Sequence, residues 1–280
     1  MTRATILIPA HDEAGVIVRT LQHLSRGLSC EDFKIIVIAN GCTDATASKA
    51  RAALPQAVVI ETDAPGKCNA LNLGFCQAEQ DKPVICLDAD LDVTADALHA
   101  LIAPLTDGTA LASCGRMDVC ASGASALVRA YYNGWRTNPY FDRGKFGGLF
   151  ALSPQAAARV FPLPHITADD EFVRRSFASN EIACVNTCRF TVRMPMTLAS
   201  LARVRRRSLR GAREIAALGL PSPERGSIGT VVRRAVRNPK TALNVGVYAC
   251  VNAWVRVRLA CQPQGKNYQW ERDLTTRSAR

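Results

Sequence analysis

Three polar clusters follow three apolar segments in the first 90 residues of this 280-residue chain: Pro9–Glu13, Asn40–Asp44 and Asp88–Asp90. Carboxylate oxygens such as those of the last cluster are ligands that Mg²⁺ and Mn²⁺ prefer. Each cluster alone has a structural explanation, since Asn40-Gly41 is a common turn and acidic residues often end a strand. Three such clusters at successive strand ends are better explained by a shared site.

The apolar segments alternate with helical patterns, which predicts βαβ units and an α/β fold. The expected strands are Ala4–Pro9, Phe33–Ala39, Ala57–Glu61 and Pro83–Leu87. The expected helices are Glu13–Arg26, Thr43–Leu54 and Lys67–Ala78. Short, continuously apolar strands indicate a mainly parallel sheet with helices on both faces. Sites in such sheets form beyond the carboxyl ends of the strands, where the three polar clusters lie.

Two nucleotide-binding motifs are excluded by their spacing. A dinucleotide fold needs GxGxxG after the first strand, whereas this chain has PAHDEAG there. A phosphate-binding loop needs GxxxxGK[ST], and the segment Gly66-Lys67-Cys68 lacks both the earlier glycine and the hydroxyl.

The charge is distributed unevenly along the chain. The whole sequence has 35 Lys and Arg against 24 Asp and Glu, a net charge of +11. Residues 1–188 contain 16 basic and 20 acidic side chains, a net charge of −4, and residues 189–280 contain 19 and 4, a net charge of +15. A basic C-terminal region predicts an anionic partner, such as nucleic acid, a membrane surface or a phosphorylated substrate, or else a solvated basic face.

The chain resembles the family 2 glycosyltransferases, which have a GT-A fold, over roughly Thr5 to Arg207. IPAHDEAG stands where that family has PxYNE, NGCTDAT where it has DGSTDxT, and GKCNALNLG where it has GKxxALNxG. DAD matches its DxD, GGLFALS its mid-chain glycine segment, and ADDEFVRR its ED segment. Six segments in the family's order make the resemblance specific.

The resemblance implies a nucleotide-diphosphate sugar donor and a divalent cation, Mg²⁺ or Mn²⁺, that stabilises the departing diphosphate. Asp90 would bind the metal directly, and Asp88 would contact the ribose or the metal's waters. The residues implied in binding the donor are Pro9, His11, Glu13, Asn40, Lys67, Asp88, Gly147, Gly148 and Arg206.

The resemblance also implies a general base, because the acceptor hydroxyl must lose a proton as it attacks the anomeric carbon. Asp170 aligns with that base and Asp169 with its neighbour, which is usually Glu. The pair opens a helical pattern over Ala168–Ala178, so acidic residues that complement a helix dipole are the structural alternative. A direct attack of this kind inverts the anomeric centre.

Two departures from the family affect the nucleobase. The family commonly has an aromatic residue where this chain has His11, and paired carboxylates where it has Ala39-Asn40. An Asn side chain both donates and accepts hydrogen bonds, whereas Asp only accepts. Recognition of uridine is therefore weakened, and a guanosine donor stays open.

The basic C-terminal region predicts two helices, Thr197–Leu218 and Thr241–Ala260. Arg203–Arg207 resembles the family's QxxRW segment only loosely, which argues against a processive polymer synthase; Arg206 could still reach the diphosphate. The second helix suits either a membrane surface or packing on the catalytic domain. We therefore expect a catalytic domain over residues 1–195 and a basic helical region over 196–280.

These observations predict an inverting, metal-dependent glycosyltransferase that acts on a lipid-linked or glycan acceptor, with nucleic acid unlikely as a partner. A nucleotidyltransferase and a catalytically decayed basic binding module are the alternatives. The apolar run Ala4–Ala10 is too short for a signal peptide, and the 11 cysteines suit a reducing compartment. We expect a cytoplasmic protein, either free or peripheral on the inner face of the cell membrane.

Overall fold

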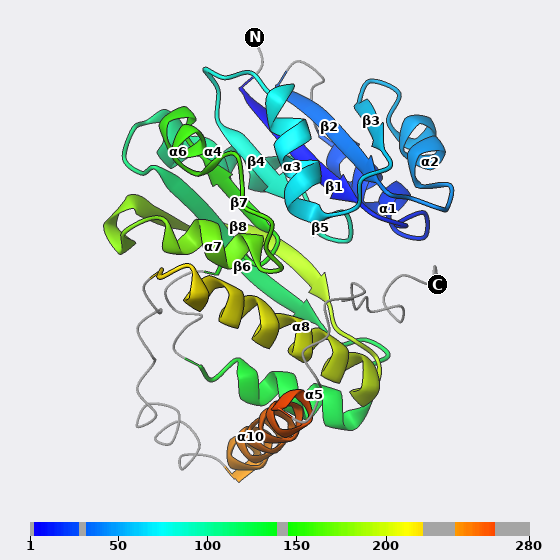
Figure 1. The fold of residues 1–280 in the computed structure, drawn as a ribbon, viewed down its shortest axis with the longest axis vertical. Helices are drawn as coiled ribbons and strands as arrows, with labels where there is room; N and C mark the ends of the chain where they lie inside the picture. The colour runs from blue at the N-terminus through cyan, green and yellow to red at the C-terminus, as the bar shows by residue number, and fades with distance from the viewer. Residues whose placement is uncertain (1–2, 28–31, 139–144, 221–238, 261–280) are drawn as a thin grey trace. The chain divides into compact units, whose positions relative to one another are not determined.

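The computed structural model describes residues 3–27, 32–138, 145–220 and 239–260, which form two compact units (Figure 1). The first unit spans Met1–Asp118 and Gly144–Val192, and the second spans Val119–Arg143 and Arg193–Ser278. The chain passes from the first unit to the second between Val192 and Arg193, close to the boundary expected at residue 195. It also enters the second unit at Val119, so a mid-chain segment belongs with the C-terminal helices.

The first unit is built on an eight-stranded sheet with the order β3-β2-β1-β4-β7-β6-β8-β5. The strands are β1 Ala4–Ala10, β2 Phe33–Asn40, β3 Val58–Thr62, β4 Val84–Leu87, β5 Asp92–Val93, β6 Ala112–Cys120, β7 Leu149–Leu152 and β8 Ile182–Arg193. Strands β1 to β4 pair in parallel, as the sequence predicts. The pairings of β4 with β7, β7 with β6, and β8 with β5 are antiparallel, so the sheet is mixed.

Helices cover both faces of this sheet. They are α1 Ile17–Ser25, α2 Thr46–Ala53, α3 Lys67–Cys76, α4 Ala95–Thr106, α6 Pro154–Val160 and α7 Asp169–Arg175, with a 3₁₀ turn, η2, at Ser179–Glu181. Alternate residues of a strand face opposite sides. Ile6 and Ile8 of β1 therefore pack in one cluster with α1, α2 and α4, while Leu7 packs in another with α3, α6 and α7.

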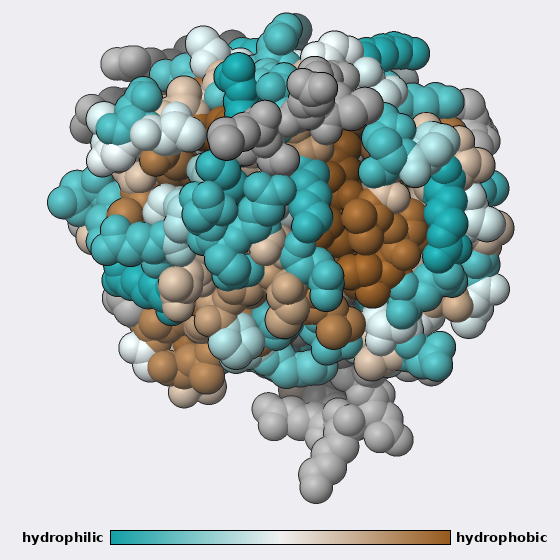
Figure 2. All heavy atoms as spheres, turned by 90° about the horizontal axis from the view of Figure 1, so that it is seen from above, coloured by the Kyte–Doolittle hydropathy of each residue, from teal (hydrophilic) through white to brown (hydrophobic). Residues whose placement is uncertain are grey.

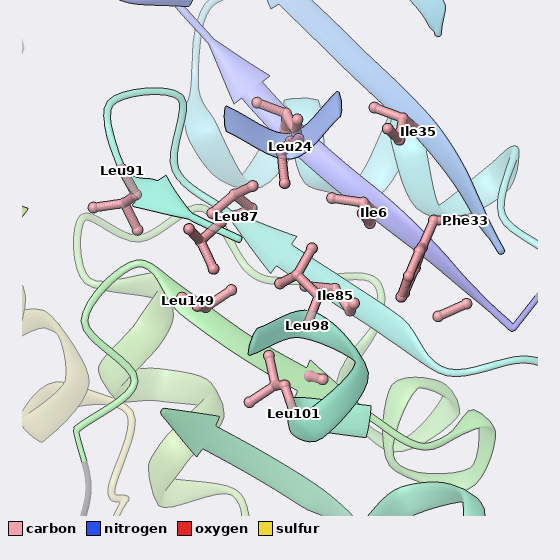
Figure 3. Packing of buried hydrophobic residues seen from close by; sticks show 14 of the residues in the cluster. Ile6, Leu24, Phe33, Ile35, Ile85, Leu87, Leu91, Leu98, Leu101 and Leu149 are labelled. Carbon is pink, nitrogen blue, oxygen red and sulfur yellow. The ribbon is translucent and has the colours of Figure 1, made fainter. Parts of the chain in front are cut away.

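The first of these clusters is shown in Figure 3, where Leu98 and Leu101 of α4 lie beside Ile85 and Leu149 of the sheet. All four side chains are fully buried. Burial of each leucine or isoleucine contributes about 1.5–3 kcal/mol relative to exposure, so this cluster fixes β4 against its neighbours. Figure 2 shows an outer face on which hydrophilic residues flank patches of hydrophobic ones.

Helix α1 begins at Ile17, four residues after the Glu13 start that the sequence predicts. Asp12 has a φ of 49°, in the left-handed region, and the carbonyl of Glu13 accepts hydrogen bonds from the N–H groups of Val16 and Ile17. Residues 14–16 therefore form a turn before the helix. Glu13 consequently lies in the connection between β1 and α1.

The second unit contains the helices α5 Ala126–Trp135, α8 Leu198–Ala217 and α10 Pro239–Ala260. They share a core in which Val128 of α5, Leu201 of α8 and Val255 of α10 are buried. A side chain at Gly134 would collide with the main chain of Asn244, so this glycine lets α5 and α10 approach closely. Among the helices that the structure describes, none is long and apolar enough to cross a membrane.

Candidate active site

The turn Asp88–Asp90 leaves the carboxyl end of β4 and is held through its main chain. The Asp88 N–H donates to the carbonyl of Gly148 (2.8 Å), and the hydroxyl of Thr20 donates to the carbonyl of Ala89 (2.7 Å). Arg19 donates to the carbonyl of Asp90 (3.4 Å). These three bonds hold the turn by its main-chain atoms.

Lys67, the first residue of α3, joins two carboxylates from distant parts of the chain. Its Nζ lies 2.7 Å from Oδ1 of Asp88 and 2.9 Å from Oδ2 of Asp169, the first residue of α7. Burial alone would lower the pKa of Lys67, but Asp169, Asp88 and Asp170 together raise it well above its ordinary value. Lys67 is therefore charged at neutral pH and ties the DAD turn to α7.

Asp169 and Asp170 differ in their surroundings. Asp169 is 3% exposed; burial raises the pKa of its carboxyl above the ordinary value, and Lys67 opposes that rise. Asp170 is half-buried, and its Oδ1 accepts a hydrogen bond from the N–H of Glu171 (2.8 Å). Of the two carboxylates, that of Asp170 is the more exposed, and the role of each in catalysis stays a prediction.

Gly147 and Gly148 have φ angles of 52° and 88°, which favour glycine. A Cβ at Gly148 would lie 2.8 Å from Cγ of Asp88, closer than such atoms approach. The space that a side chain at Gly148 would need is filled by Asp88, and the predicted role of Gly148 beside a sugar stays a prediction. Its absent side chain makes room for a carboxylate of the site.

The carboxyl ends of β1 and β2 meet through Asn40. Its side-chain amide donates to the carbonyl of Ala10 (2.9 Å) and accepts from the N–H of Gly66 (3.0 Å), and the residue is 2% exposed. This geometry corrects the prediction that Asn40 contacts the nucleobase, since its polar atoms bind the protein's own main chain. It connects β1, β2 and the residue before α3.

His11 lies at the same edge and is half-buried, with Nδ1 2.6 Å from the carbonyl of Asn40. One ligand atom each of His11, Asp12 and Cys42 lies within 4.8 Å of the others. Burial raises the pKa of the Cys42 thiol. Sequence reasoning singled out His11 but missed Asp12 and Cys42, although the ends of β1 and β2 were the signal that could have found them.

Pro9 lies in β1 and Glu13 in the connection that follows it, and their part in donor binding stays a prediction. Pro9 lies in β1 beyond Leu7, the last residue that pairs with β4, so its missing N–H costs no hydrogen bond there. Glu13 is 6% exposed and its N–H donates to the hydroxyl of Thr46 (2.7 Å). Arg206 lies on α8 in the second unit, and its part in donor binding stays a prediction.

The sequence profile described as Glycosyl transferase family 2 matches residues 5–162, more than half of the chain. No curated protein matches the chain in sequence. The match contains five of the six segments that carry the resemblance, and the sixth, ADDEFVRR at residues 168–175, lies beyond it.

Solved structures share the fold at low sequence identity. A mannosyltransferase from Pyrobaculum calidifontis, solved with GDP-Man and Mn²⁺, is 21% identical with a TM-score of 0.60, over 92% of this chain and 78% of that one. Glucosyl-3-phosphoglycerate synthase from Mycobacterium tuberculosis, solved with phosphoglyceric acid, is 19% identical with a TM-score of 0.57, over 78% and 80%. The same synthase, solved with Mn²⁺, UDP-Glc and glycerol 3-phosphate, is 20% identical with a TM-score of 0.55, over 78% of this chain and 80% of that one. The predicted glycosyltransferase fold is confirmed.

Proposed function

Since this chain belongs to glycosyl transferase family 2 and is therefore a glycosyltransferase, we propose that it transfers a sugar from a nucleotide-diphosphate sugar to a hydroxyl group with inversion. Family membership decides against the nucleotidyltransferase alternative. The observation that carries the proposal is the cluster in which Lys67 joins Asp88 to Asp169 at the carboxyl end of β4. This cluster unites the DxD and ED segments, which lie about 80 residues apart in sequence.

Asp90 and Asp88 are the residues that would hold Mg²⁺ or Mn²⁺. Their carboxylate oxygens are the ligands that a hard cation prefers, and both residues lie on the turn that follows β4. When bound, the ion would supply Lewis-acid stabilisation of the diphosphate. Lys67 adds a second positive charge on the same side of the turn.

Asp170 is proposed as the general base that accepts the proton of the acceptor hydroxyl. The N–H of Glu171 holds its Oδ1, which orients the carboxylate. Asp169 suits this role less, because it is buried and engaged by Lys67. Direct displacement at the anomeric carbon, with Asp170 on the side of the acceptor, gives the inverted product.

The donor and acceptor are proposed only as classes. Among the structural neighbours, one was solved with GDP-Man and another with UDP-Glc, so both nucleobases belong in a test. We propose a lipid-linked or glycan acceptor, with association of the basic helices at an anionic membrane surface. A small phosphorylated acid, as bound by the synthase from Mycobacterium tuberculosis, is the second acceptor class.

A panel of UDP- and GDP-sugars tests the function, with release of the nucleoside diphosphate measured with Mg²⁺, with Mn²⁺ and with chelator. We expect release from at least one donor, dependent on the divalent ion and lost in Asp170→Asn. The anomeric configuration of the product, read by NMR, tests inversion. Release that is equal in chelator, or a retained anomeric configuration, would contradict the proposal.

A further inference from the structure

The ends of β1 and β2 bring together an imidazole, a carboxylate and a thiol, of which only the imidazole of His11 is predicted to contact the donor. One ligand atom each of His11, Asp12 and Cys42 lies within 4.8 Å of the others, and all three residues are half-buried. Ligands of a tetrahedral ion with bonds of about 2.0–2.3 Å lie roughly 3.3–3.7 Å apart, so a movement of about 1 Å would close the set.

These residues are three departures from the family's sequence motifs. Where the family has PxYNE and DGSTDxT, this chain has His11 for Tyr, Asp12 for Asn and Cys42 for Ser. The motifs are some 30 residues apart in sequence, yet the three changes meet in space. Each change introduces a stronger metal ligand than the residue it replaces.

Neighbouring groups already orient the three side chains. The carbonyl of Asn40 can only accept, so the contact of 2.6 Å assigns the hydrogen of His11 to Nδ1 and the lone pair to Nε2. The N–H of Thr43 donates to Oδ1 of Asp12 (2.6 Å). The N–H of Asp12 in turn donates to Sγ of Cys42 (3.4 Å), and Sγ lies 3.4 Å from the carbonyl of Ala10.

We propose that His11, Asp12 and Cys42 form a binding site for Zn²⁺ or a similarly soft divalent ion, separate from the hard-cation ligands Asp88 and Asp90. A set with one sulfur, one nitrogen and one oxygen favours Zn²⁺ over Mg²⁺. Three protein ligands leave a fourth position for water or another small ligand. Binding would replace the thiol proton of Cys42 with the metal and release that proton to solvent.

Titration calorimetry with Zn²⁺ in excess Mg²⁺ tests the site on the full-length protein, since Mg²⁺ occupies hard-cation ligands. We expect one equivalent of Zn²⁺ to bind the wild type. Cys42→Ser and His11→Tyr restore the family's residues. Each should lower the affinity for Zn²⁺ by about tenfold or more, because a thiolate or imidazole ligand is lost. Cys76→Ser removes an exposed thiol outside the site and should leave the affinity unchanged.

A second readout is independent of activity and of the donor. Cd²⁺ in place of Zn²⁺ should give the ultraviolet charge-transfer absorption of a metal thiolate in the wild type and in Cys76→Ser, but not in Cys42→Ser. Circular dichroism confirms that each variant is folded. No Zn²⁺ binding by the wild type, or equal binding and absorption in folded Cys42→Ser, would overturn the proposal.

Discussion

The two units meet the same physical problem, a charge close to a core, in opposite ways. In the first unit Lys67 lies between the carboxylates of Asp88 and Asp169, so a half-buried cation is neutralised by acidic partners. In the second unit two arginines of α8 bind neutral acceptors: Arg205 donates to Oδ1 of Asn252 (3.1 Å) and Arg203 to the hydroxyl of Ser200 (2.9 Å). Residues 189–280 contain only 4 acidic side chains against 19 basic ones.

The difference separates the residues that we expect to act in catalysis, in the acidic cluster, from the arginines of α8 that we expect to attract an anionic partner. An arginine bound to a neutral acceptor keeps its full charge for an anionic partner, whereas Lys67 is committed to its two acids. We therefore expect substitutions in the acidic cluster to change turnover by orders of magnitude. Substitutions of single arginines in α8 should change binding to anionic surfaces by small factors.

The largest expected effect is that of Asp90→Ala. Loss of a metal ligand removes several kcal/mol of stabilisation, so nucleoside diphosphate release should fall by about 10⁴-fold or more while the fold is kept. Asp81→Ala is the matched control, because the Asp81 side chain is 76% exposed and lies outside the cluster. Full activity of a folded Asp90→Ala protein, or wild-type activity undiminished by chelator, would contradict the metal role.

Asp170→Asn should lower the turnover number by about 10² to 10⁴ and leave donor affinity intact, since an amide has the shape of the carboxylate but cannot take a proton. Turnover and donor binding are measured separately, by product release and by calorimetry. Asp107→Asn, at an exposed helix end, serves as the control. A collapse of donor affinity with little change in turnover would make Asp170 a binding residue.

Sequence patterns predicted the first half of the fold well, because a continuously apolar strand followed by an amphipathic helix has few alternatives in a parallel sheet. The antiparallel strands β6 and β8 were not predicted, since their registers depend on partners far away in sequence. In the site, the short motifs pointed to Asp88 and Asp169, which Lys67 joins, and to Asp90 and Asp170, whose roles stay predictions. Motifs give no side-chain direction, so they could not show that Asn40 faces the protein or that Gly148 makes room for Asp88.

Gly148→Ala should have an effect of intermediate size, on stability and on the acidic cluster. A left-handed φ of 88° and the contact with Asp88 together should cost about 1–3 kcal/mol of stability and displace the Asp88 carboxylate. Gly108→Ala is a close control, because Gly108 has a φ of 71° and, apart from Gly108 and its two chain neighbours, no atom of the described residues lies within 4 Å of the place that its Cβ would take.

Both glycine variants should lose stability in thermal unfolding, but only Gly148→Ala should require more Mg²⁺ or Mn²⁺ for half-maximal activity. That second measurement separates displacement of Asp88 from backbone strain. An equal metal requirement in the two variants would mean that the close contact with Asp88 has no part in the site.

The smallest expected effect concerns α8 and an anionic membrane surface. A basic residue near such a surface contributes about 1 kcal/mol, or about fivefold in binding, and the attraction fades within a Debye length of about 8 Å at physiological salt. Arg213 is exposed on α8, so Arg213→Gln should weaken co-sedimentation with anionic vesicles at low salt by up to that factor. Arg51→Gln removes the same charge from the first unit, where Arg51 pairs with Glu61 (2.5 Å), and should have no effect.

Attachment to anionic vesicles should also weaken as salt rises, except for a part due to exposed apolar residues of α10 such as Leu243 and Val257. Equal recovery of the wild type with neutral and anionic vesicles at low salt would show that the arginines of α8 serve packing or phosphate binding alone.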